Sequence, residues 1–320
     1  MKKPNDTKEE LDVLLKIPYP FSAEQANAVI LCVKYLQLIA GPGAGKTEVM
    51  VRRVLYLILC LQVPAELITI IAFTNKNVES IKSTIYKRAE SYGDSTLMEK
   101  VNRLNIHTIH SLCKKIVQEF AGYGDFDVFP PERELPLLMR KGIDFGIQYL
   151  PPLPSKPKPW KWILFLDTVS LIENEMMDFK ELKIANPLFM DKMENYYRFL
   201  EKHRFMTHSM MTRKAIEYLE REDSIKPDIK YLMVDEYQDI NPAQDKLIRL
   251  LSKDADLTVV GDPFQTIYQW RGSDRSFFEN FSETYPSSIT LKLENNYRSR
   301  GDIVGFINDV KSTIIFSPDK

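Results

Sequence analysis

The fold of this chain is decided by the stretch Ala40-Gly41-Pro42-Gly43-Ala44-Gly45-Lys46-Thr47. The residues around it predict a buried strand over 36–40 and a helix over 47–61. Glycines let backbone N–H groups turn towards phosphate oxygens, and a helix N-terminus adds partial positive charge. The Lys46 ammonium suits the outer phosphates of a nucleotide, and the Thr47 hydroxyl suits Mg²⁺. The alternative is a turn with a chance Gly-Lys-Thr, which the flanking strand and helix argue against.

Strands and helices alternate on both sides of this loop. Short apolar runs predict strands over 68–73, 231–234, 257–260 and 288–293, and helices are predicted after Ser22, over 77–91 and from Arg300. Residues 121–230 break the pattern, because they are rich in Leu, Met, Lys and Glu and show no convincing strand. We therefore predict an α/β fold whose parallel sheet is built from two sequence segments, with a helical subdomain inserted between them.

Two of the predicted strands end in polar residues that suit phosphoryl transfer. Asp235 and Glu236 follow the strand 231–234, and an α/β sheet binds its ligands at the carboxyl ends of its strands. We predict that Asp235 holds Mg²⁺ through water and that Glu236 orients and deprotonates the attacking water. Gln265 follows the next such strand and is expected to contact the γ-phosphate or its water. The plainer alternatives are a solvated strand end and a Gly-Asp-Pro turn with an idle glutamine.

The composition is globular and shows no bias towards polyanions. The 320 residues carry 43 Lys and Arg against 44 Asp and Glu, so any nucleic-acid binding must come from a local patch. With 44% hydrophobic and 27% charged residues, the chain is not a disordered tail, a collagen or a small disulfide scaffold. The polar first ten residues, the short apolar run 54–61 and three cysteines without a CxxC pair lead us to expect a cytoplasmic protein with no membrane partner.

Two other groupings have competing interpretations. His107, His110 and Cys113 recur every three residues, which is a spacing for metal ligands on one helix face, but a fourth ligand is missing and we expect no metal. Trp160 and Trp162 lie in a basic stretch with Lys156, Lys158 and Lys161. That stretch suits duplex DNA, although we favour a solvated loop that is packed by its tryptophans.

Taken together, seven stretches resemble the motifs of the N-terminal half of a UvrD/Rep/PcrA-type superfamily 1 DNA helicase, in the family's order and at compatible spacing. They are FSAEQ at 21–25 (Q motif), AGPGAGKT at 40–47 (Walker A), AFTNK at 72–76 (motif Ia), IHTIHSL at 106–112 (motif Ib), VDEYQD at 234–239 (motif II), GDPFQTIYQWRG at 261–272 (motif III) and LENNYRS at 293–299 (motif IV). Glu48 departs from the pattern, since many members have an arginine there near the base.

The resemblance implies a set of site residues. For catalysis they are Lys46, Asp235, Glu236, Gln265 and Arg298. For ATP they are Gln25, which would read adenine, the loop residues Ala40, Gly41, Pro42, Gly43, Ala44, Gly45, Lys46 and Thr47, and Tyr297, which would pack on the base. For Mg²⁺ they are Thr47 and Asp235, and for DNA they are Phe73, Thr74, Asn75, His107, Tyr268, Trp270 and Arg271.

Three of these assignments have a simpler structural alternative. Gln25 and Ser22 have capping-box spacing, so helix capping and adenine reading compete for one side-chain amide. Phe73 also suits a core residue that closes its strand. Tyr297 and Arg298 also suit an ordinary aromatic and a surface cation at a lobe boundary.

The resemblance also implies a domain organisation. A lead-in over 1–17 precedes a RecA-like P-loop NTPase sheet, the ATP-binding motor lobe, over 18–120 plus 225–295. A helical insertion subdomain occupies 121–224. Residues 296–320 are expected to be the first helix of a second motor lobe, whose later motifs have no counterpart in this sequence.

The function implied is an ATP- and Mg²⁺-dependent helicase or translocase that moves 3′-to-5′ on single-stranded DNA or a 3′-tailed duplex. We expect this half alone not to unwind DNA. The alternative is a non-motor module that binds nucleotide and DNA, or a subunit whose second lobe a partner chain supplies. A P-loop kinase or GTPase does not fit the aromatic-rich stretch 261–272. Repair, replication restart and defence against foreign DNA all remain open as pathways.

Overall fold

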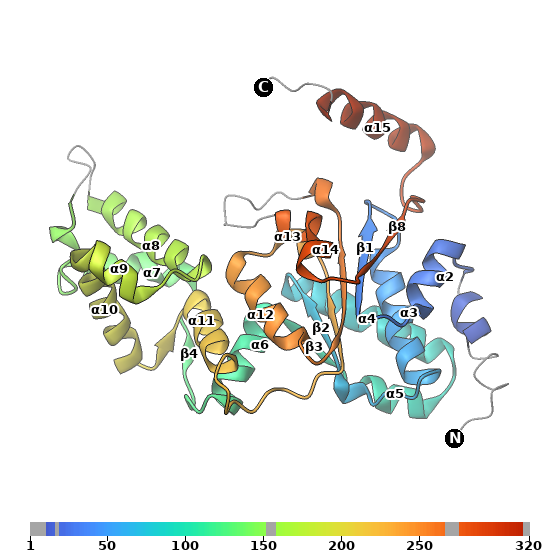
Figure 1. The fold of residues 1–320 in the computed structure, drawn as a ribbon, viewed down its shortest axis with the longest axis horizontal. Coiled ribbons are helices and arrows are strands. Elements are labelled where there is room, and N and C mark those ends of the chain that lie inside the picture. Colours follow the sequence, from blue (N-terminus) through green and yellow to red (C-terminus); the bar gives the residue numbers. More distant parts are fainter. Residues whose placement is uncertain (1–10, 17–18, 152–157, 266–274, 316–320) are drawn as a thin grey trace.

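The computed structural model describes residues 11–16, 19–151, 158–265 and 275–315. Its centre is a parallel sheet of six strands (Figure 1). The strand order is β3-β2-β6-β7-β1-β8, and every neighbouring pair is parallel. The strands are β1 (Tyr35–Ala40), β2 (Ile68–Ala72), β3 (Asn105–Thr108), β6 (Tyr231–Val234), β7 (Asp256–Gly261) and β8 (Ile289–Leu293). The α/β class and the predicted strands are confirmed, with ends that differ by one or two residues.

Strand β3 is the strand of this six-stranded sheet that the sequence pattern did not reveal. Its four residues, Asn-Ile-His-Thr, form an edge of the sheet, and only Ile106 is buried. An edge strand has one neighbour and needs no continuous apolar run, so its sequence carries little strand signal.

Helices cover both faces of the sheet. One face packs against α2 (Ala23–Ile30), α3 (Lys46–Leu59), α4 (Asn75–Ser91) and α5 (Ser95–Val101). The other face packs against α6 (Ile109–Lys115), α11 (His208–Leu219), α12 (Pro242–Ser252), α13 (Ser276–Glu279) and α14 (Phe281–Thr284). Strand residues alternate between the faces: Val234 lies in the second core and Met233 in the first, as a two-residue period requires.

The region between β3 and β6 is mainly helical and extends to the left of the sheet in Figure 1. It contains α7 (Pro131–Lys141), α8 (Lys158–Asn174), α9 (Phe179–Ala185) and α10 (Pro187–Lys202), with one π-helical turn at Ile116–Phe120. We expected no strand here, but β4 (Asp127–Val128) pairs with β5 (Phe205–Met206). The pair is two residues long on each side, which is too short to leave a periodic pattern.

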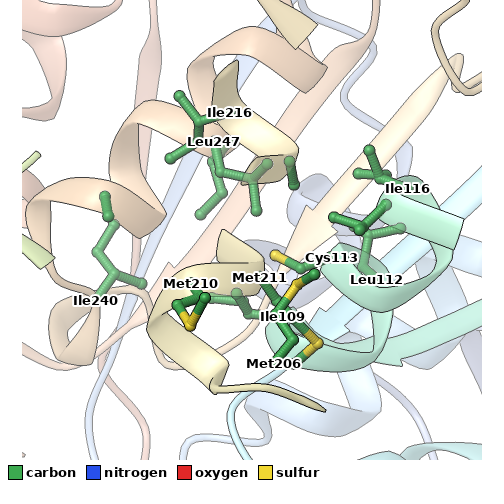
Figure 2. Packing of buried hydrophobic residues seen from close by; sticks show 14 of the residues in the cluster. Ile109, Leu112, Cys113, Ile116, Met206, Met210, Met211, Ile216, Ile240 and Leu247 are labelled. Atoms are coloured by element: carbon green, nitrogen blue, oxygen red, sulfur yellow. The ribbon is translucent and has the colours of Figure 1, made fainter. Parts of the chain in front are cut away.

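The helical region and the sheet share one hydrophobic core. Figure 2 shows Ile109, Leu112 and Cys113 from α6 packed with Met206, Met210 and Met211, and Leu247 of α12 joins the same cluster. The last helix, α15 (Gly301–Ile315), stands apart from this body in Figure 1 and exposes Ile303 and Phe306. Within the described ranges, no helix combines the length and apolar character needed to cross a membrane.

Candidate functional site

The loop between β1 and α3 has the geometry of a phosphate-binding loop. β1 ends at Ala40 and α3 begins at Lys46, so the backbone turns from strand to helix over Gly41–Gly45. Gly43 and Gly45 have φ values of 74° and 84°, in the left-handed region that side chains disfavour. The N-terminus of this 14-residue helix therefore points free N–H groups and a partial positive charge into the loop.

Gln25 is held at both ends of its side-chain amide. Its Oε1 accepts a hydrogen bond from the Ser22 backbone N–H at 3.1 Å, which completes the predicted capping box. Its Nε2 donates to the Ala44 carbonyl of the phosphate loop, also at 3.1 Å. Both hydrogen bonds of this buried glutamine are structural, and each leaves one further acceptor or donor position of the amide available.

The segment after β8 is fastened to the phosphate loop. Asn296 Nδ2 donates to the Pro42 carbonyl at 2.7 Å, and the Tyr297 N–H donates to the Gly43 carbonyl at 2.9 Å. Asn296 Oδ1 accepts from the N–H groups of Arg298 and Ser299, both at 2.8 Å, which folds the segment into a tight turn. The Tyr297 ring is 60% exposed. The loop and motif IV thus form one unit.

Two acidic residues follow β6 at the same edge of the sheet. Glu236 adopts a left-handed backbone conformation, with φ of 52°, and its Oε2 lies 3.2 Å from Lys46 Nζ. Asp235 is buried, and burial, reinforced by the Glu236 charge, raises the pKa of Asp235 to about 7. Burial and the same charge raise the pKa of Asp239 to about 6. A strained backbone and perturbed carboxyl groups in one place are typical of a functional site.

Asp235 also has an atom that fits a magnesium ion. Its Oδ1 is buried and has no hydrogen-bond partner among the described residues. Such an oxygen is costly to leave alone, and a cation supplies what it lacks. Mg²⁺ is commonly held by one or two carboxylates together with phosphate oxygens, so the carboxylate of Asp235 fits it. Thr47, the other predicted ligand, lies in the first turn of α3. Among the described residues, no group of three or more His, Cys, Asp or Glu side chains is arranged to hold a metal ion. His107, His110 and Cys113 therefore do not form such a group.

A chain of buried and half-buried hydrogen bonds connects Glu236 to Gln265. Gln238 Nε2 donates to Glu236 Oε2 at 2.8 Å, and Gln238 Oε1 accepts from the Asp262 N–H at 3.1 Å. Gln265 Nε2 then donates to Asp262 Oδ2 at 2.7 Å. Sequence reasoning assigned no role to Gln238, Asp239, Asp262 or Asn296. All four lie within the quoted motifs, so the signal was present, but their partners depend on which strands are neighbours.

The predicted DNA-binding residues that the structure describes lie at the carboxyl ends of β2 and β3. Phe73 is half-buried, while Thr74 and Asn75 are exposed at the start of α4, where the Thr74 hydroxyl caps the helix by accepting the Asn77 N–H at 3.1 Å. His107 pairs in register with Ile71 on the neighbouring strand, and burial lowers its pKa. Tyr268, Trp270 and Arg271 lie outside the described residues.

The two other groups of residues noted in the sequence, the histidines with Cys113 and the tryptophans, differ in their burial and contacts. The His110 ring stacks on the His208 ring with centroids 4.2 Å apart, and Cys113 is buried beside Thr212. The predicted solvated loop is wrong at these positions, because Trp160 and Trp162 lie in helix α8. Trp162 is buried in the helical region, whereas Trp160 is 41% exposed.

Glu48, which replaces the arginine of many family members, is bound by two arginines. Arg88 donates to both of its carboxylate oxygens at 2.8 and 3.0 Å, and Arg52 Nε donates at 2.9 Å. The buried Arg52 also donates to the carbonyls of Leu14, Leu15 and Tyr19, which fixes the segment before α2. Positive charge therefore remains beside the phosphate loop although residue 48 is acidic.

Comparison with known proteins identifies the family of this chain. The profile of the UvrD/REP helicase N-terminal domain family matches residues 21–286. The ATP-dependent DNA helicase PcrA of Staphylococcus epidermidis is 29% identical over 302 residues, which cover 90% of this chain and 39% of that protein. The ATP-dependent DNA helicase Rep of Buchnera aphidicola is 29% identical over 300 residues, 90% of this chain and 42% of that protein. The chain thus spans about two fifths of these relatives' length, and it belongs to the UvrD/REP helicase N-terminal domain family.

Proposed function

We propose that this chain is the ATP-binding motor lobe of an ATP- and Mg²⁺-dependent DNA helicase or translocase that moves 3′-to-5′ along single-stranded DNA. One observation carries the proposal: the phosphate-loop Lys46, the carboxylate of Glu236 and the amide of Gln265 belong to one connected set of side chains. These are the groups that binding a nucleotide, activating water and sensing the γ-phosphate require.

Each residue then has a defined task. The loop N–H groups and Lys46 bind the phosphates, while Asp235 and Thr47 would hold Mg²⁺, which would supply positive charge beside the phosphate oxygens. Glu236 orients the attacking water and accepts its proton. When nucleotide binds, Lys46 moves from Glu236 to the phosphates, which frees the carboxylate for this role.

The DNA track is proposed along the carboxyl edge of β2 and β3. Thr74 and Asn75 present the start of a 17-residue helix, α4, to a phosphate, and His107 lies on the neighbouring strand. Phe73 would add base stacking, which is worth about 1–3 kcal/mol per base and tolerates any sequence.

The test is nucleotide binding and turnover by the purified chain, with Lys46→Ala as background. We expect Mg²⁺-dependent binding of a fluorescent ATP analogue, slow hydrolysis that single-stranded DNA accelerates, and no separation of a 3′-tailed duplex. Absence of nucleotide binding contradicts the site, and robust unwinding by this chain alone contradicts its role as half of a motor.

A second candidate is a nucleotide- and DNA-binding subunit whose second lobe comes from a partner chain. The observation that favours it is the uncovered surface beyond β8, where Tyr297 is 60% and Phe306 69% exposed. The intact mass of the protein in its source cells separates the two. A mass well above 37.2 kDa supports the single-chain motor, and a mass of 37.2 kDa supports the subunit.

A further inference from the structure

Gln238 is a buried side chain whose polar atoms all contact functional segments. It lies two residues after Glu236 in a short 3₁₀ turn at Tyr237–Asp239, and only 1% of its surface is exposed. Nε2 donates to Glu236 Oε2 at 2.8 Å, and Oε1 accepts from the Asp262 N–H at 3.1 Å. One amide thus bridges two segments that lie 24 residues apart in sequence.

The protein leaves room for this bridge at Gly261. A Cβ atom added to Gly261 would collide with Gln238 Oε1 and would also lie 3.1 Å from the Phe278 ring. The close approach of the amide to the end of β7 therefore requires a glycine there.

The far side of the bridge is equally fixed. Asp262 is 2% exposed, and its Oδ1 accepts from the Phe264 N–H at 3.0 Å. Its Oδ2 accepts from Gln265 Nε2 at 2.7 Å. A displacement of the 262–265 turn must therefore change the position of the Asp262 N–H relative to the Gln238 amide that it contacts.

We propose that Gln238 is a positioning residue that sets the orientation of Glu236 and ties it to the turn carrying Gln265. This inference rests on the proposed function, because it deepens the role of the same site. Two donors, Lys46 and Gln238, converge on Glu236 Oε2, and Lys46 is required by the nucleotide. Once Lys46 has turned to the phosphates, Gln238 is the donor that still holds the carboxylate in place.

Two substitutions separate the two halves of the bridge. Gln238→Met keeps the length of the side chain but removes both the donor and the acceptor. Gln238→Glu keeps an acceptor for the Asp262 N–H and, where it is ionised, removes the donor to Glu236. A misplaced catalytic group commonly costs about 10²-fold in rate, so we expect kcat to fall about 10–100-fold in both variants while nucleotide affinity changes less than about threefold.

The experiment combines single-turnover ATP hydrolysis in the presence of single-stranded DNA, nucleotide binding, and hydrogen exchange at the Asp262 amide. The expected result is slower turnover in both variants, with faster amide exchange in Gln238→Met alone. Gln244→Met is the matched control, because Gln244 makes a capping box at the start of α12 and should alter stability but not kcat.

The outcomes distinguish this inference from the proposed function. Normal turnover in both Gln238 variants, or loss of nucleotide binding along with turnover, overturns the positioning role. Unchanged exchange of the Asp262 amide in Gln238→Met also overturns it. Wild-type turnover no higher than that of Lys46→Ala contradicts the proposed function itself.

Discussion

Lys46 and Glu236 form an ion pair across the candidate site, with Nζ 3.2 Å from Oε2 and with 13% and 24% of the two side chains exposed. The proposed phosphate-binding cation and the proposed general base therefore neutralise each other's charge in this structure. Binding a nucleotide exchanges one anionic partner of Lys46 for another, so part of the attraction between Lys46 and phosphate replaces an existing contact.

Glu236→Gln is expected to separate binding from chemistry. The amide cannot accept the proton of water, so turnover should fall about 10²–10⁴-fold. Nucleotide affinity should stay equal or rise, because Lys46 loses its competing carboxylate. Titration with a fluorescent nucleotide beside a phosphate-release assay measures both, and unchanged turnover would refute the assignment of the base.

Asp235→Asn is expected to remove the effect of Mg²⁺ on nucleotide binding. In the unaltered chain, chelating Mg²⁺ should weaken ATP affinity at least about tenfold, because Asp235 Oδ1 and the phosphates then lose their shared cation. In the variant, affinity with and without EDTA should agree within about twofold. The readout is the ratio of the two dissociation constants, and a full Mg²⁺ effect in Asp235→Asn shows that the ion is held elsewhere.

Gly43→Ala is expected to disrupt the contact between the phosphate loop and motif IV. The added Cβ would lie 2.7 Å from Arg298 Cβ and 2.8 Å from Asn296 Oδ1, on a residue with φ of +74°. We expect a loss of about 1–3 kcal/mol in stability and at least tenfold weaker nucleotide binding. Gly41→Ala is the control for stability, since its Cβ meets nothing within 4 Å of the protein. Equal loss of stability by the two variants in thermal melts would contradict the close packing seen at Gly43.

Glu173→Gln is expected to stabilise the helical region in a pH-dependent way. Burial raises the pKa of Glu173 from 4.5 to about 7, although Tyr197 donates a hydrogen bond to it. Because the pKa of Glu173 is raised, its contribution to the stability of the fold is fully present below the ordinary pKa of 4.5 and is lost as the pH rises through about 7. Relative to the unaltered chain, the free energy of unfolding of the variant should therefore rise by about 1–3 kcal/mol more at pH 8 than at pH 5. This corresponds to a few degrees in melting temperature. The exposed neighbour Glu175→Gln should show no such difference.

Much of the fold could be predicted because its central strands are buried on both sides. β2 is buried along all five residues, and such strands appear as continuous apolar runs. The phosphate loop and the acidic pair could be found for a related reason, since each follows such a run. Edge strand β3 lacks that signal, and the two-residue pair β4/β5 is too short to carry one.

The contacts within the site could not be predicted, because they depend on strand order. Val234 pairs with Val259, and this register brings Gln238 next to Gly261 and Asp262. The sequence shows where two strands end but not that they are neighbours. Gln25 is a different case: its predicted capping box is present, its contact with Ala44 was not foreseen, and its reading of adenine stays a prediction.

The attachment of Asn296 and Tyr297 to the phosphate loop has a mechanical consequence. Only residues 298–300 separate this attachment from α15, which begins at Gly301 and stands clear of the sheet (Figure 1). Any torque applied to α15 therefore reaches the carbonyls of Pro42 and Gly43 before it reaches a strand. In the other direction, a nucleotide that reshaped the loop would swing a helix of 15 residues, so a displacement of a fraction of an ångström at the phosphates would be enlarged at its far end.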